Sequence, residues 1–125
     1  MEDISQQLLY QRLRNSVIEL LEMHSSYEDL AALGAFESIN MVDDWLPLDY
    51  SEAPKVFSEI EKEVVSQFIA FAEAAAEATK SDTWDVEYFK SAEEWVRLSE
   101  FSKHALAIFE KRGRFSEEVE EHLTA

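Results

Sequence analysis

Apolar side chains recur at helical spacing along most of the chain. In residues 3–23 they follow one another at intervals of three or four positions, and polar side chains fill the positions between them. This is the pattern of an amphipathic helix that buries one stripe of its surface. The same spacing returns in residues 27–42, 54–79 and 91–111, so the pattern predicts four main helices.

Turn and capping residues separate these segments. Pro47 disfavours helical backbone at the residue before it, which predicts that the second helix ends there. Ser51 and Pro54 are both compatible with the first turn of the third helix. Ser91 and Glu94 have the spacing of a capping box and predict the start of the fourth helix. Short helices are predicted at residues 84–90 and 117–123.

The same patterns predict which side chains are buried. Leu30, Leu33 and Phe36 lie on the expected inner side of the second helix, and Ile60 lies on the apolar stripe of the third. Arg14 falls among the polar positions of the first helix and is expected outside the core. Few glycines and prolines are present to form hairpin turns. We therefore expect an all-α fold: an antiparallel bundle of four main helices with one or two short ones, in a single domain spanning residues 1–125.

Charge narrows the range of partners. The 125 residues include 27 Asp and Glu against 11 Lys and Arg, and the formal net charge is −16. A field of this sign repels phosphates and anionic lipids and attracts basic proteins, so direct binding of nucleic acid is not expected. The chain has no cysteine and no apolar run long enough to span a bilayer. These features predict a cytoplasmic protein without membrane association.

The acidic residues are concentrated in one stretch. Between Arg14 and Lys55 the chain has no Lys or Arg, and this stretch contains the loop of residues 41–54, where acidic residues flank a tryptophan and a tyrosine. Interface hot spots favour Trp and Tyr, and surrounding charges speed association with a partner of opposite charge. The expected partner-binding residues are Glu37, Asp43, Asp44, Trp45, Asp49, Tyr50 and Glu52. The alternative is a solvated turn in which Trp45 and Leu46 only cap the bundle.

The sequence contains no motif that identifies an enzyme. His24, His104 and His122 do not form a paired-ligand spacing on one helix face, and they are expected at surface or boundary positions. There is no Gly-rich phosphate loop, no nucleophile elbow and no calcium loop. We therefore expect a protein that is not an enzyme and that has no metal site and no cofactor.

One pair of residues offers a catalytic alternative. Arg97 and His104 are seven positions apart, which places them on one face of the predicted fourth helix. The pair resembles the Arg-x(4–6)-His signature of the HEPN superfamily, which includes metal-independent ribonucleases. The resemblance implies an arginine that stabilises the phosphorane and a histidine that transfers protons. RNA would then have to approach a strongly negative surface.

The chain is similar in kind to the immunity proteins of bacterial toxin systems, of the contact-dependent growth inhibition and colicin types. Locally, Asp49-Tyr-Ser-Glu-Ala53 with the VFSEIEKE of residues 56–63 resembles the D-Y-[ST]-E-A start of the first helix in colicin DNase immunity proteins. The paired tyrosines followed by proline that those proteins use for binding have no counterpart here, so no family binding residue is carried over.

The resemblance implies an antitoxin-like protein that binds a basic toxin domain, expected to be a nuclease, and neutralises it by occluding its surface. An inhibitor that mimics nucleic acid is a further alternative, in which carboxylates would be spaced like phosphates along one face.

Overall fold

The computed structural model describes residues 4–46 and 56–123, and the elements within them are all helices. They are α1 (Gln6–His24), α2 (Tyr27–Leu33), α3 (Ala35–Trp45), α4 (Glu59–Ala78), α5 (Val86–Ser91) and α6 (Glu93–Glu110). The expected all-α class is confirmed, while the antiparallel four-helix bundle stays a prediction. None of the described helices combines the length and apolar character needed to cross a membrane.

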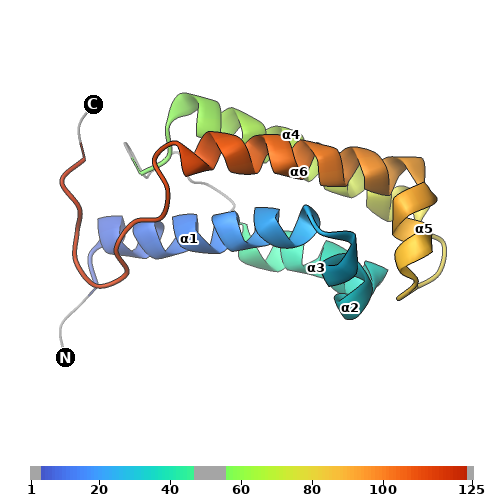
Figure 1. The fold of residues 1–125 in the computed structure, drawn as a ribbon. Coiled ribbons are helices and arrows are strands. Elements are labelled where there is room, and N and C mark those ends of the chain that lie inside the picture. Colours follow the sequence, from blue (N-terminus) through green and yellow to red (C-terminus); the bar gives the residue numbers. More distant parts are fainter. Residues whose placement is uncertain (1–3, 47–55, 124–125) are drawn as a thin grey trace.

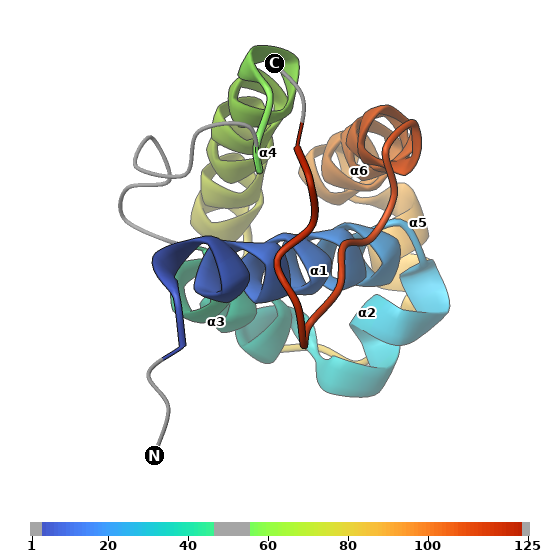
Figure 2. The ribbon, with the colours of Figure 1, turned by 90° about the vertical axis from the view of Figure 1, so that its left-hand side faces the viewer.

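The helices form two layers. α4 and α6 lie side by side in the upper layer of Figure 1, and α1 and α3 lie beneath them. The short helices α2 and α5 contact each other and close one end of the molecule. The end-on view in Figure 2 shows the C-terminal segment descending from α6 and crossing α1. The two layers face each other across the core.

The core between the layers is rich in aromatic side chains. Trp95, Phe68, Phe89 and Phe109 are each buried to 1% exposure or less. Burial of a side chain of this size contributes roughly 1.5–3 kcal/mol. The indole N–H of Trp95 donates a 2.9 Å hydrogen bond to the hydroxyl of Thr79, so the polar atom of this ring is also satisfied.

The single second helix predicted from the sequence is wrong, because the chain breaks at Gly34. This glycine ends α2 and precedes α3 with φ of 92° and ψ of 157°, a backbone conformation open to glycine and rarely to other residues. The side chain of Trp84 occupies the space where a Cβ at position 34 would project. The glycine therefore allows the tryptophan to pack directly on the backbone between two helices.

The start of α4 also differs from the expectation. Ser51 and Pro54 lie outside the described residues, and the helix begins at Glu59 after the N-cap Ser58. The Ser58 hydroxyl accepts a hydrogen bond from the backbone N–H of Glu61, and the Glu61 carboxylate accepts one from the backbone N–H of Ser58. This reciprocal capping box fixes the helix start at Glu59, five residues later than the sequence pattern suggested.

The capping box predicted for α6 is wrong. Ser91 is the last residue of α5, and its hydroxyl donates to the backbone carbonyls of Glu87 and Tyr88 instead. The N-cap of α6 is Ala92, which has no side-chain oxygen to offer. The hydroxyl of Ser91 is therefore used to end one helix rather than to begin the next.

The short helix predicted at residues 117–123 is not formed. Side chains of α1 hold this C-terminal segment instead: the Gln11 amide donates to the carbonyls of Ser116 and Val119, each at 2.9 Å. The Asn15 side chain both donates to the Phe115 carbonyl and accepts from its N–H. Because α1 side chains satisfy these backbone groups, the segment gains less from forming its own helical hydrogen bonds.

Arg14 was expected on the polar face of the first helix, but the structure buries its side chain completely. Its guanidinium donates to both oxygens of Glu61 and to the backbone carbonyls of Gly113, Val56 and Phe109. All five N–H donors of the side chain thus have an acceptor. This complete pairing offsets the cost of removing the charge from water.

Candidate functional site

The outer face of α3 carries three of the residues predicted to bind a partner. Glu37, Asp43 and Asp44 are exposed, together with Asn40 and Phe36, whereas the opposite side of the helix is buried. We refer to these five exposed residues as the α3 outer face. Phe36 was expected in the core, but 43% of its surface is exposed. The helix therefore presents an aromatic ring at its N-terminal end and carboxylates along its length.

Trp45 was predicted to contact a partner, but its side chain is not fully exposed. Its side chain is half-buried and packs against the core at the end of α3. This placement resembles the alternative in which the ring caps the helices. The predicted partners Asp49, Tyr50 and Glu52 lie outside the described residues, so their grouping around Trp45 stays a prediction.

A second tryptophan, Trp84, is the most exposed large aromatic side chain among the described residues, at 61%. The polar segment before it fixes its position at the N-terminus of α3. The backbone N–H of Ala35 donates to the carbonyl of Thr83, and that of Phe36 donates to the Asp82 carboxylate, each at 3.0 Å. Gly34 has no side chain to cap α3, and these acceptors satisfy helix donors in its place.

These contacts join Trp84 to the α3 outer face. One surface of the indole packs on the backbone of Gly34, where its Nε1 atom would lie 2.6 Å from an added Cβ. The remaining surface is open to solvent at the same end of α3 as Phe36. An anchored ring with an exposed face is the kind of group that contributes strongly to protein interfaces.

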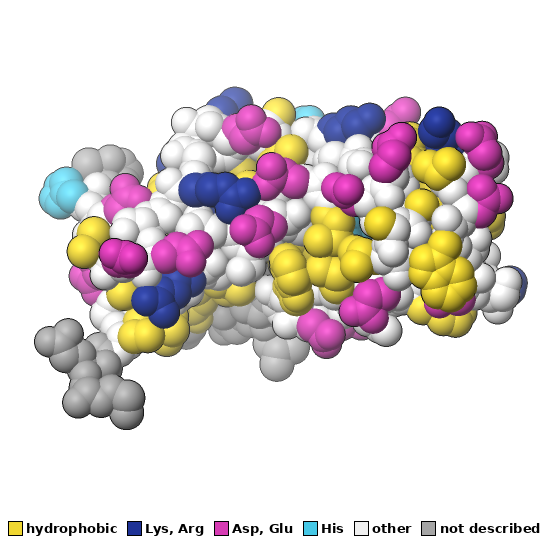
Figure 3. All heavy atoms as spheres, turned by 60° about the horizontal axis from the view of Figure 1, so that its bottom comes forward, with side chains coloured by type: hydrophobic (Ala, Val, Ile, Leu, Met, Phe, Trp, Pro, Cys, Tyr) yellow, Lys and Arg dark blue, Asp and Glu magenta, His cyan; other side chains and the backbone are white. Residues whose placement is uncertain are grey.

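The acidic residues around this surface are mostly uncompensated. Every described acid between Arg14 and Lys55 is exposed, and five of them have no Lys or Arg partner among the described residues. The five are Glu28, Asp29, Glu37, Asp43 and Asp44. Figure 3 shows hydrophobic patches flanked by Asp and Glu on the half of this face nearer to α2 and α5. The surface therefore combines apolar contact area with a negative field.

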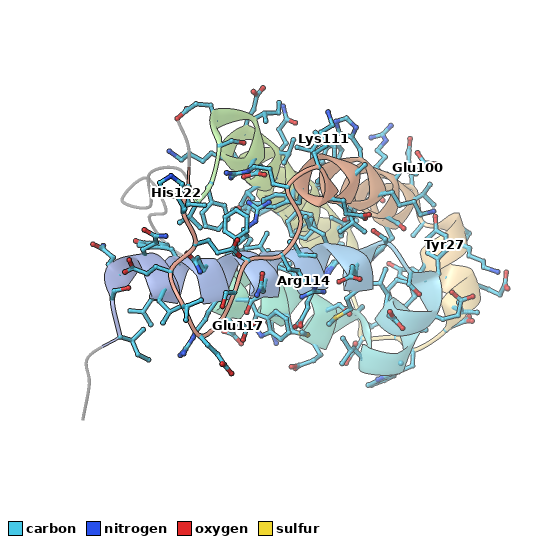
Figure 4. The ribbon with its side chains drawn as sticks, turned by 60° about the vertical axis from the view of Figure 1, so that its left-hand side comes forward. Tyr27, Glu100, Lys111, Arg114, Glu117 and His122 are labelled. Atoms are coloured by element: carbon cyan, nitrogen blue, oxygen red, sulfur yellow. The ribbon has the colours of Figure 1, made fainter. Side chains whose placement is uncertain are left out.

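A shallow groove of about 380 Å³ lies between α1 and α2. Its apolar lining comes from Met23, Ala32 and Leu33, and its acidic lining comes from α1 and α2. The guanidinium of Arg114, in the segment that crosses α1 in Figure 4, pairs with two acids of this lining, Glu19 at 3.4 Å and Glu22 at 2.5 Å. Two of the acids that line the groove are thus already paired with a cationic group from the chain itself.

The residues of the catalytic alternative lie apart from this surface. Arg97 and His104 are both exposed on α6, and Arg97 pairs with Glu93 one turn away. They line two separate hollows, one beside Phe71 and Ala74 and the other beside Ile108. The structure therefore puts them on the same helix without bringing them to one concave site.

The histidines occupy two kinds of environment. His104 and His122 are exposed, whereas His24 is fully buried, which corrects the expectation of a boundary position. Burial lowers the pKa of the His24 imidazole, although the carbonyls of Leu20 and Ser38 act in the opposite direction. Among the described residues, no three His, Asp or Glu side chains converge as metal ligands would.

The sequence contained a signal for Trp84 that its interpretation did not use. The residue directly follows the polar turn of residues 81–83, at the very start of the predicted short helix of residues 84–90. An isolated glycine inside a helical pattern also indicates a close approach by another group. Only the structure connects the two signals, because Gly34 and Trp84 are 50 positions apart in the chain.

No protein-family model, no curated protein and no solved structure matches this chain.

Proposed function

We propose that this chain is an acidic immunity or antitoxin-like protein that binds a basic protein domain and occludes its surface. The observation that carries the proposal is the exposed ring of Trp84, anchored on Gly34 at the N-terminal end of α3, whose outer face carries unpaired carboxylates. Buried tryptophans dominate the affinity of many interfaces, and opposite charges at the rim speed association.

The chemistry of this surface favours a basic protein over other partners. Unpaired carboxylates repel the phosphates of a nucleic acid. A cationic protein surface would gain both from the apolar rings and from the negative field. A bacterial toxin nuclease fits this description, because a domain that binds nucleic acid carries a positive surface. We propose such a nuclease as the partner, with the neutralising protein acting in the cytoplasm.

Capture of partners from the source cells tests this proposal. The protein is used as bait, and retained proteins are washed across a salt gradient. We expect a basic nuclease that is retained at physiological salt and released at high salt, and whose cleavage of nucleic acid is inhibited by stoichiometric amounts of the bait. Retention of RNA with no basic protein would overturn the proposal and direct attention to the HEPN-like alternative, for which His104→Ala should abolish RNA cleavage.

Substitutions on the proposed surface test whether it binds the partner. Trp84→Ala should weaken the complex by about 30-fold, or about 2 kcal/mol, because the ring is a central contact. Neutralising Glu37, Asp43 and Asp44 together as Gln, Asn and Asn should slow association. A matched control neutralises three exposed acids of α4, Glu63, Glu73 and Glu77, with the same change in net charge. Equal effects of the two triple variants would place the binding surface elsewhere.

A further inference from the structure

A hollow whose lining includes two cationic side chains lies in the layer formed by α4 and α6. It has a volume of about 400 Å³ and lies between the first turn of α4 and the C-terminal half of α6. Its lining residues are Ser58, Ile60, Glu61, His104, Ile108, Lys111 and Arg112. We refer to it as the α4–α6 hollow. None of the residues of the α3 outer face contributes to it, so its function is independent of the binding proposed above.

The one carboxylate in the hollow is already neutralised. Glu61 accepts two hydrogen bonds from Arg14, at 2.7 and 3.0 Å, and a third from Arg112 at 2.6 Å. One negative charge therefore faces two guanidiniums. The positive end of the α4 dipole adds to the same field. In a chain with a net charge of −16, the charged residues that line this hollow thus include one carboxylate, Glu61, and two cations, Lys111 and Arg112.

Lys111 brings a further cation that has no partner within the described part of the chain. Its side chain is exposed, and the structure gives it neither an ion pair nor a hydrogen bond. By contrast, Lys62 and Lys90 each lie within 4 Å of a carboxylate. Figure 4 shows Lys111 at the end of α6 on the side away from α1. Its ammonium group is therefore free to meet an anion from outside.

The apolar part of the hollow is unusually open to solvent. Ile60 was expected in the core, yet 51% of its surface is exposed in the first turn of α4. Ile108 is half-buried and lines the same hollow from α6. Small-molecule sites combine an apolar lining with a few polar groups that fix orientation, and their volumes begin at about 300 Å³. The α4–α6 hollow has both properties.

We propose that the α4–α6 hollow binds a small amphipathic anion, in which a carboxylate or phosphate head meets Lys111 and a short apolar body covers Ile60 and Ile108. The neutralised Glu61 does not repel the head group. The two isoleucines lose their contact with water when the body is bound, which supplies the apolar part of the affinity.

Titration of the full chain with octanoate, followed by NMR, tests the proposal. We expect saturable shifts of the methyl signals of Ile60 and Ile108. Octanol has the alkyl chain without the charge, and acetate has the charge without the alkyl chain. Each should therefore bind at least about tenfold more weakly than octanoate. Octyl phosphate shows whether the head group is a carboxylate or a phosphate, and tighter binding of either supports the site. An absence of saturable shifts with both octanoate and octyl phosphate overturns it.

Substitutions at two exposed residues test the location of the site and should leave the fold intact. Lys111→Gln and Ile60→Ser should each lower the affinity for octanoate by about fivefold. Lys90→Gln removes the same charge from α5, outside the hollow, and should leave the affinity within about twofold of the unmodified protein. Equal effects of Lys111→Gln and Lys90→Gln would mean that octanoate responds only to net charge, and the assigned site would be wrong.

Discussion

The guanidinium of Arg14 in α1 and the carboxylate of Glu61 in α4 form a buried ion pair with two hydrogen bonds, 2.7 and 3.0 Å long. Burial alone would raise the pKa of Glu61. Hydrogen bonds from Arg14, Arg112 and the Ser58 backbone outweigh that effect, so the pKa lies below its ordinary value. Glu61 therefore remains charged at neutral pH and ties α1 to the start of α4.

Removing one partner of this pair should destabilise the protein strongly. Arg14→Met removes five hydrogen bonds, two to the buried Glu61 carboxylate and three to backbone carbonyls, and we expect a loss of about 3–5 kcal/mol in the free energy of unfolding. Urea denaturation followed by circular dichroism measures it. The control is Arg97→Met, which breaks an exposed pair with Glu93 and should cost less than about 1 kcal/mol. Similar losses in both variants would contradict the structural role of the buried pair.

The buried His24 predicts a dependence of stability on pH. Its pKa is lower in the folded protein, so below about pH 6.5 the unfolded chain takes up a proton that the folded chain does not. Stability is therefore full above that pH, and it should fall by up to about 1.4 kcal/mol per unit as the pH drops toward 5. Measurements of unfolding free energy from pH 7 to 5 test this.

The slope should be flatter in His24→Gln, whatever that variant costs in stability. A double variant of the exposed histidines, His104→Gln with His122→Gln, keeps His24 and should keep the slope. An unchanged slope in His24→Gln would show that another group is responsible.

Gly34→Ala should destabilise the protein and move Trp84. The substitution places a Cβ 2.6 Å from the indole Nε1 atom, at a φ of 92° that L residues rarely adopt. Strain of this kind costs roughly 1–3 kcal/mol before the displacement of the ring is counted. Gly113→Ala is a matched control, because its φ is also positive but no atom lies within 4 Å of the added Cβ.

Tryptophan fluorescence and thermal unfolding follow both variants. A shift of the emission in Gly34→Ala, together with a larger fall in melting temperature than in Gly113→Ala, would support the contact. Equal effects in the two variants would argue that Trp84 does not rest on this glycine.

Ser99→Ala should stabilise the protein by about 1 kcal/mol. The Ser99 hydroxyl is buried and has no hydrogen-bond partner among the described residues. No hydrogen bond therefore offsets the free energy lost when this hydroxyl is removed from water. Ser102 lies one turn away, and its hydroxyl donates to the Leu98 carbonyl at 2.7 Å. Ser102→Ala should therefore be neutral or destabilising. Chemical denaturation of both variants compares them, and a loss of stability in Ser99→Ala would contradict the unsatisfied hydroxyl.

The sequence alone determined the helical class and the approximate position of the longer helices. Apolar spacing of three and four residues follows directly from helix geometry, and it located α1, α4 and α6 to within a few residues at most ends. The concentration of acids before Lys55 is likewise a property of the sequence, and the described acids there are all exposed. Local rules suffice where the interacting residues are near neighbours in the chain.

The tertiary structure decided the features that depend on distant partners. Arg14 reads as a surface residue until Glu61 and three backbone carbonyls surround it. Residues 117–123 read as a helix until the side chains of α1 take their backbone hydrogen bonds. Trp84 was predicted as the first residue of a short helix, but it precedes α5 and its ring packs on Gly34. In each case a contact across many positions outweighs the local preference, because burial and complete pairing of polar groups contribute more free energy than helix propensity does.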